Sequence, residues 1–260
     1  MDLGLAGRVV VITGGSDGLG AATASALLAE GARVAICGRD ERRLRDAEAA
    51  LAASASAPED VLAVVADVTD PAACERLVAA TVTRWGRLDA LVNNAGASSA
   101  GAFTALDDDR WSADLGLKVL AAARLSRLAH PHLARSDSAA ILNVLSITAK
   151  APGPGSMPTS VSRAAGLAMT KALAQEWGPD GIRVNAVLIG MVRSGQWERI
   201  ARSRGLDLED LLQQRAEAIP LRRVAEAAEL GALATLLLSP RCGYVSGAAV
   251  TFDGGVSAAV

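Results

Sequence analysis

The chain has 260 residues, of which 51% are hydrophobic, 21% are charged and 3% are aromatic, and its formal net charge is −2. This length and hydrophobic fraction suit one well-buried α/β domain and exclude a disordered chain. The small net charge, without a long run of one sign, argues against a nucleic-acid partner. No apolar run approaches the ~18 residues of a membrane span.

The three cysteines, Cys37, Cys74 and Cys242, are isolated from one another in the sequence. Because they form no Cys-x-x-Cys pair, neither a zinc site nor a disulfide framework is predicted. Reduced thiols, together with an N-terminal segment that does not resemble a signal peptide, are typical of a cytoplasmic protein. We therefore expect a cytoplasmic protein with no metal, no nucleic acid and no membrane among its partners.

Short β-branched runs alternate with helical patterns rich in Ala and Leu. Strands are predicted at Arg8–Thr13, Ala32–Gly38, Val61–Asp67, Ala90–Ala95, Ala139–Ser146, Ile182–Gly190 and Ala248–Phe252. Most are near-continuous apolar runs, as in parallel strands covered on both faces. Crossover helices are predicted at Gly18–Glu30, Glu41–Ala53, Pro71–Trp85 and Ala164–Trp177. The alternation predicts one domain over residues 1–260, a doubly wound parallel sheet of about seven strands with helices on both faces.

Two segments depart from this alternation. Thr148–Pro158 contains three prolines and two glycines, which predicts a loop. Met191–Pro220 is an insertion before the last helix and strand, and its part Gly195–Ile219 has a helical pattern of mixed polarity. Ligands bind at the carboxyl ends of parallel strands. We therefore predict that residues 191–220 form a substrate lid.

The segment VVVITGGSDGLGAATASALLAEG has the order strand, glycine turn, helix. Gly14, Gly18 and Gly20 stand in GxxxGxG spacing, which lets the backbone approach a pyrophosphate and adopt positive φ angles. The following helix presents backbone N–H groups to the phosphates. An ordinary tight turn is the alternative, but the flanking strand and helix favour a dinucleotide site.

The end of the second predicted strand, ICGRDE, bears on which nucleotide binds. An acidic residue there would bind the adenosine ribose hydroxyls, whereas an arginine accommodates a 2′-phosphate. Gly38 takes the place of the acid and Arg39 follows it, which favours NADP(H) over NAD(H). Asp17, inside the glycine turn, opposes this preference. A surface charge at the start of a helix is the alternative interpretation of Arg39.

Further motifs follow in order: VVADVTD, LVNNAG, DGIRVNAVLIG and the closing VSGAAVTFDGG. With the glycine turn, they resemble the short-chain dehydrogenase/reductase family over essentially the whole chain. The resemblance implies a Rossmann-type fold, a nicotinamide cofactor, a small-molecule substrate and a homotetramer or homodimer. It implies cofactor contacts at Gly14, Ser16, Gly18, Leu19, Gly20, Arg39, Asp67, Val68, Asn94, Ala95, Gly96, Arg163, Gly190 and Ser194.

Similar enzymes use a serine, a tyrosine, a lysine four residues after the tyrosine, and an asparagine. The tyrosine delivers the proton, because the lysine and the nicotinamide charge lower its pKa. Ser146 matches the serine, but Thr159 and Arg163 stand at the tyrosine and lysine positions, and Lys118 stands at the asparagine position. The chain thus resembles a divergent member of the family without the Tyr-x-x-x-Lys pair.

The replacements are not chemically equivalent to the residues they replace. A threonine hydroxyl is a far weaker acid than a phenol, and the guanidinium of Arg163 cannot relay a proton. Lys118 can, because buried lysines lose their charge readily. The alternative to this role of Lys118 is an ordinary salt bridge to Asp114, four residues earlier. Lys150 is a second candidate acid, with a surface charge as its alternative.

These residues leave three functions open. The first is an NADP(H)-dependent oxidoreductase acting on a small carbonyl or a conjugated enone or enoyl substrate, with Ser146, Thr159, Arg163 and Lys118 as catalytic groups. The second is a non-redox enzyme of enolate chemistry, such as aldol, retro-aldol, dehydration or cyclisation. The third is a cofactor-binding pseudoenzyme. Ser146 and the complete groove motifs favour the first.

Overall fold

The computed structural model describes residues 1–259, and within them the fold is a single α/β domain on a seven-stranded parallel sheet. The strand order is β3-β2-β1-β4-β5-β6-β7. The order reverses between β1 and β4, which places the ligand crevice of such a sheet at their carboxyl ends. The strands are β1 (Val9–Thr13), β2 (Arg33–Gly38), β3 (Val61–Val65), β4 (Ala90–Asn93), β5 (Ala139–Ser146), β6 (Ile182–Ile189) and β7 (Ala249–Phe252).

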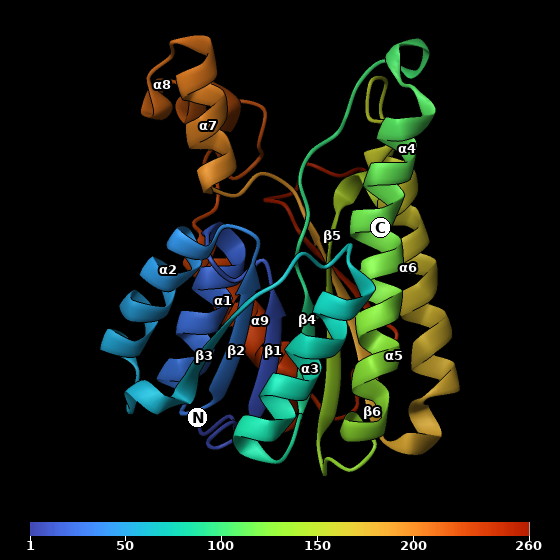
Figure 1. The fold of residues 1–260 in the computed structure, drawn as a ribbon. Coiled ribbons are helices and arrows are strands. Elements are labelled where there is room, and N and C mark those ends of the chain that lie inside the picture. The colour runs from blue at the N-terminus through green and yellow to red at the C-terminus, as the bar shows by residue number, and fades with distance from the viewer. Residues whose placement is uncertain (260) are drawn as a thin grey trace.

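Helices cover both faces of the sheet, as predicted (Figure 1). One hydrophobic core joins the strands to α1 (Gly18–Ala29), α2 (Glu41–Ser54) and α9 (Ala227–Leu238). The other joins them to α3 (Pro71–Trp85), α5 (Ala121–Leu133) and α6 (Thr159–Glu176). The packing is close because the helices carry small residues: a Cβ on Gly231 of α9 would lie 2.7 Å from the Ala22 carbonyl oxygen of α1.

Several predicted boundaries shift at the carboxyl end of the sheet. The third strand ends at Val65 instead of Asp67, and the fourth ends at Asn93 instead of Ala95. In both places the chain leaves the sheet early, and the residues beyond the strand line the cleft described below. The predicted helix Ala164–Trp177 begins at Thr159, directly after Pro158, because proline suits the start of a helix.

The predicted lid segment is two helices instead of one helical stretch: α7 (Gly195–Arg204) and α8 (Leu208–Ala216). Gly205 ends α7 with φ at 64°, and the Asp207 side chain then caps α8 by accepting hydrogen bonds from two backbone N–H groups. Figure 1 shows both helices at the top left, beyond the carboxyl ends of the strands. Helix α4 (Asp108–Leu115) rises at the top right.

Helix α4 continues into α5 through a π-helical turn, η3 (Gly116–Leu120). Such turns are rare and frequently occur at functional sites; this one carries Lys118. The loop predicted at 148–158 begins with a short 3₁₀ turn, η4 (Ile147–Ala149). In the part of the chain that the structure describes, no helix has the length and hydrophobicity to cross a membrane, and no cluster of three His, Cys, Asp or Glu side chains could hold a metal ion.

Candidate functional site

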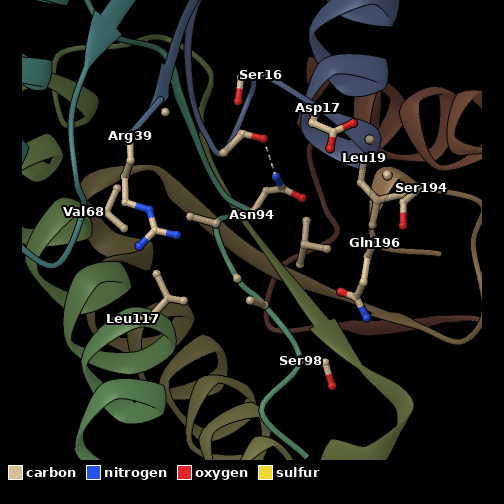
Figure 2. A pocket seen from close by; sticks show the side chains of 18 of the residues that line it. Ser16, Asp17, Leu19, Arg39, Val68, Asn94, Ser98, Leu117, Ser194 and Gln196 are labelled. Carbon is tan, nitrogen blue, oxygen red and sulfur yellow. Dashed lines mark hydrogen bonds between the residues drawn. The ribbon is translucent and has the colours of Figure 1, made fainter. Parts of the chain in front are cut away.

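A cleft of about 820 Å³ lies at the carboxyl ends of the strands. The predicted cofactor residues line it, with one exception: Gly20 is buried beneath the glycine turn instead. Figure 2 shows Asn94 near the centre, Arg39 on one side, and Asp17, Ser194 and Gln196 on the other. The structure thus brings the predicted cofactor residues from six separate segments of the sequence to one cavity.

The glycine turn is fixed by backbone geometry. Gly14 and Gly18 have φ angles of 65° and 52°, and a Cβ on Gly20 would lie 2.2 Å from the carbonyl oxygen of Gly14. Asn94 ties β4 to this turn, because its backbone N–H donates to Thr13 Oγ1 at 2.9 Å and its amide donates to the Thr13 carbonyl at 2.9 Å. The first turn of α1 has no side-chain cap, which leaves its N–H groups facing the cleft for an anion.

Arg39 lies at the end of the cleft formed by β2 and β3. Its guanidinium is 3.8 Å from the Asp67 carboxylate, and its side chain is 72% exposed. Burial would raise the pKa of Asp67, but hydrogen bonds from Thr69 and the charge of Arg39 hold that pKa below its usual range. Arg43, one turn along α2, lines the same end. Arg43 was not predicted, although it stands only four residues after Arg39, in the first turn of α2.

The segment predicted as a lid begins directly on the glycine turn. Arg199 of α7 lies 3.2 Å from the Asp17 carboxylate, and a Cβ on Gly195 would lie 2.3 Å from the same carboxylate. Asp17, which was unexpected in a phosphate-binding turn, therefore contacts α7. Gly195, Gln196 and Arg199, which belong to the segment 191–220 predicted to border the substrate, also line the cleft. The two partners of the ion pair are 182 positions apart, so no local pattern could have paired them.

Ser146, Thr159 and Arg163 line the opposite end of the cleft. Thr159 is the first residue of α6 and Arg163 follows one turn later, so both lie on one face of the helix. Ser146 ends β5, where its hydroxyl oxygen accepts hydrogen bonds from the Thr148 backbone N–H and hydroxyl at 3.2 and 3.1 Å. The structure places these three side chains at one end without a direct hydrogen bond between Ser146 and the other two among residues 1–259.

Lys118 lies behind Thr159, away from the cleft. Its side chain is 1% exposed, and its ammonium donates to Thr159 Oγ1 at 2.9 Å. It also forms an ion pair with Asp114. The salt bridge to Asp114, given as the alternative role of Lys118, is therefore present, and so is a hydrogen bond to Thr159 that was not predicted. Burial lowers the pKa of Lys118; the hydrogen bond to Asp114 opposes this shift, and the positive charge of Arg163 adds to it.

The Arg163 guanidinium lies between β5 and the segment after β4. Its Nη1 donates to the Val144 carbonyl at 2.8 Å, and a Cβ on Gly96 would lie 2.8 Å from its Nη2. Its buried Nε has no hydrogen-bond partner among residues 1–259. Burial lowers the pKa of Arg163 to about 10, against the charge of Asp114, so the group remains a cation at neutral pH.

Two further polar side chains complete this end: Asp114, predicted only as a salt-bridge partner of Lys118, and Ser162, which was not predicted. Asp114 is buried and accepts hydrogen bonds from Lys118 and from Ser162 Oγ, the latter at 2.6 Å. The spacing of Asp114 and Lys118 signalled their contact, but nothing local signalled Ser162, which is 48 positions from Asp114. Lys150 does not line the cleft and forms no hydrogen bond through its side chain within the described residues, so the structure gives it no place in this site.

Comparison with known proteins agrees with this geometry. A family model described as enoyl-(acyl carrier protein) reductase matches residues 14–257. The oxidoreductase UcpA of Escherichia coli (strain K12) is 32% identical, over 96% of this chain and 95% of its own. The chain therefore belongs to the short-chain dehydrogenase/reductase family. The relatives to which it is similar include oxidoreductases of this family.

Two solved structures are similar over nearly the full length. L-sorbose reductase from Gluconobacter frateurii, in complex with NADPH and L-sorbose, is 33% identical with a TM-score of 0.94, and the match covers 100% of both chains. An NADPH-bound short-chain oxidoreductase from Pseudomonas aeruginosa PAO1, described as containing an atypical catalytic centre, is 36% identical with a TM-score of 0.91. That match covers 97% of this chain and 98% of the other.

Proposed function

We propose that this protein is an NADP(H)-dependent reductase of a small carbonyl or conjugated enone or enoyl substrate, with unusual acid–base groups. One observation carries the proposal: the Lys118 ammonium donates a hydrogen bond to Thr159 Oγ1, and Thr159 lines the cleft beside Ser146. A lysine connected to the cleft through a hydroxyl can supply the proton that a tyrosine supplies in similar enzymes. NADPH in both similar solved structures supports the choice of cofactor.

The residues of the cleft fit such a dinucleotide. The glycine turn and the uncapped start of α1 form a cradle for a pyrophosphate. Arg39 and Arg43 supply positive charge at the adenosine end, which suits a 2′-phosphate. The unpartnered Nε of Arg163 gives the ribose end a donor. When bound, NADPH supplies the hydride.

The side chains at the Ser146 end account for the proton. The hydroxyls of Ser146 and Thr159 donate to the substrate oxygen, and the buried charges of Lys118 and Arg163 stabilise the negative charge that develops there. As carbon accepts the hydride, Thr159 gives its hydroxyl proton to that oxygen and takes a proton from the Lys118 ammonium. Lys118 becomes a neutral amine and recovers a proton from water. Arg163 remains charged throughout, because guanidinium does not release its proton.

The comparisons do not favour the two alternatives, a non-redox enzyme of enolate chemistry or a pseudoenzyme, since the named relatives are oxidoreductases. The residues 191–220 remain our proposed lid over the substrate. A homotetramer or homodimer and a cytoplasmic location remain predictions. Light scattering of the purified protein measures the first, and cell fractionation measures the second.

The proposal is tested in two steps with the purified protein. Calorimetric titration with NADPH and with NADH should give micromolar affinity for NADPH and much weaker affinity for NADH. NADPH oxidation should then be followed with a panel of ketones, quinones, enones and enoyl thioesters. Turnover of any panel member supports a reductase. Tight NADPH binding without any turnover would contradict a reductase and favour a pseudoenzyme, and binding of neither nucleotide would contradict the cofactor assignment.

A further inference from the structure

The catalytic end of the cleft rests on one buried carboxylate. Asp114 has a side chain that is 1% exposed, and it accepts hydrogen bonds from Lys118 on one oxygen and from Ser162 Oγ at 2.6 Å on the other. The Thr159 hydroxyl also lies 3.4 Å from the first oxygen. A single side chain of α4 thus reaches the π-helical turn and the first turn of α6.

Three charges share this interior. Asp114 is the only negative one, and Lys118 and Arg163 are positive. Among residues 1–259, these two partners are the charged groups that act on Lys118, one from its own helix and one from α6. A buried ammonium beside a buried guanidinium is costly without a counter-charge. The Asp114 carboxylate therefore supplies the counter-charge that both cations need in this interior.

The hydroxyl of Thr159 shows how the carboxylate reaches the chemistry. Thr159 Oγ1 accepts from Lys118 at 2.9 Å and from the Ser99 backbone N–H at 3.2 Å. Two donors saturate the lone pairs of a hydroxyl, so its own proton is left to donate. In this structure that proton is donated to the Asp114 carboxylate over a long 3.4 Å contact, which a substrate oxygen in the cleft can replace. The position of Lys118, held by Asp114, therefore decides whether the Thr159 proton is directed to a substrate oxygen in the cleft.

We propose that Asp114 is a positioning residue for the reaction: it fixes the Lys118 ammonium against Thr159 Oγ1 and keeps Lys118 in its proton-carrying form. This inference rests on the proposed reductase function. Asp114 does not line the cleft and acts only through Lys118, Thr159 and Ser162. Without its charge, the ammonium would lose its proton at lower pH, because burial and Arg163 then act on it unopposed.

The chain offers an unusually clean test, because its only lysines are Lys118, Lys150 and Lys171. Protein labelled with ¹³C,¹⁵N-lysine therefore gives three side-chain signals, and the Lys118→Arg variant assigns the missing one. The titration of the Lys118 ¹³Cε signal with pH needs neither substrate nor cofactor. In the wild type, the ¹⁵Nζ shift of Lys118 at neutral pH should be that of an ammonium; the shift of a neutral amine would overturn the proposal.

The decisive comparison is between Asp114→Asn and Ser162→Ala. Asp114→Asn removes the charge and keeps the shape, so the titration midpoint of Lys118 should fall by about one pH unit or more. Ser162→Ala removes the hydrogen bonds of Ser162 Oγ to Asp114 and to the Thr159 carbonyl but leaves every charge in place, so the midpoint should stay close to that of the wild type. Equal titration midpoints of Lys118 in the two variants would show that Asp114 acts only in packing, and would overturn the proposal. If Asp114→Asn does not fold, Asp114→Ser makes the same test.

Kinetics with a panel substrate provide the second readout. For reduction, Lys118 must carry its proton, so kcat falls as pH rises through its pKa. Asp114→Asn should move this alkaline limb to lower pH, and Asp114→Glu should restore it toward the wild-type position. If the alkaline limb of the kcat profile lies at the same pH in folded Asp114→Asn as in the wild type, the proposal is overturned. If no substrate is turned over, the reductase proposal fails separately, and the NMR titration still decides the effect of Asp114 on Lys118.

Discussion

The two ends of the cleft are held in place by different parts of the chain. At the glycine turn, the backbone itself forms the site, and the φ angles and close contacts of Gly14, Gly18 and Gly20 leave no room for other residues. At the opposite end, side chains of α4, η3 and α6 form a buried polar network around Asp114. A backbone site can hardly be changed without being lost, whereas a side-chain site can be rebuilt with other residues.

The largest effect should follow from adding one methyl group at the glycine turn. In Gly20→Ala, the new Cβ meets the Gly14 carbonyl oxygen at 2.2 Å, so the turn must move and its phosphate cradle is lost. NADPH affinity should fall by about 100-fold or more, roughly 2.7 kcal/mol. Gly153→Ala is the matched control, since nothing lies within 4 Å of its Cβ. Equal calorimetric affinities in the two variants would contradict a backbone-built site.

Ser146→Ala tests the end of the cleft that is built from side chains. Removing this hydroxyl takes one donor from the developing oxyanion, so kcat should fall by about 100-fold. NADPH affinity should stay unchanged, because Ser146 is one of the groups assigned to the substrate oxygen. Steady-state kinetics and calorimetry on the same preparation separate the two effects. A loss of NADPH affinity with unchanged kcat would place Ser146 in cofactor binding instead.

Arg39→Ala tests the charge at the adenosine end. If Arg39 binds a 2′-phosphate, its removal should weaken NADPH by about 10-fold to 100-fold, the worth of a charge-assisted hydrogen bond, and leave NADH unchanged. Arg42→Ala is the control, because Arg42 is exposed in α2, three residues after Arg39, and does not line the cleft. Equal losses for NADPH and NADH would show that Arg39 does not select the 2′-phosphate.

The smallest effect is expected where α7 meets the glycine turn. The Asp17–Arg199 pair is exposed, and such pairs contribute about 1 kcal/mol or less. Arg199→Gln should therefore change NADPH affinity by only a few-fold, with a weaker effect at high salt. Arg202→Gln, later in α7 and away from the cleft lining, serves as the control. A change in affinity above about 10-fold would mean that Arg199 contacts the cofactor directly.

The sequence could predict the features that short segments carry. The sheet, both faces of helices and the strand Ala139–Ser146 follow from local hydrophobic patterns and were correct. The contact between Asp114 and Lys118 follows from helical spacing. The two helices within residues 191–220 were harder to predict. The helical pattern hid the break at Gly205, because residues on both sides of the glycine favour helix equally well.

Contacts between distant segments could not be predicted. Lys118 and Thr159 are 41 positions apart, and their hydrogen bond depends on how the π-helical turn sits against α6. The burial of Lys118 behind Thr159 was equally hidden, because the sequence pattern gives a helix face but not the depth of a side chain. Motifs therefore predicted which residues meet at the cleft, and only the packing of three helical segments showed how they are connected.

The central claim is that Lys118 supplies the proton of the reaction, and Lys118→Arg tests it most directly. Arginine keeps a positive charge beside Asp114, but it does not release a proton at neutral pH. Calorimetry should show unchanged NADPH affinity for this variant, which also verifies its fold. NADPH oxidation with a substrate of the wild type should then fall by about 100-fold or more, within the range for a lost general acid. Turnover at the wild-type rate would contradict the account.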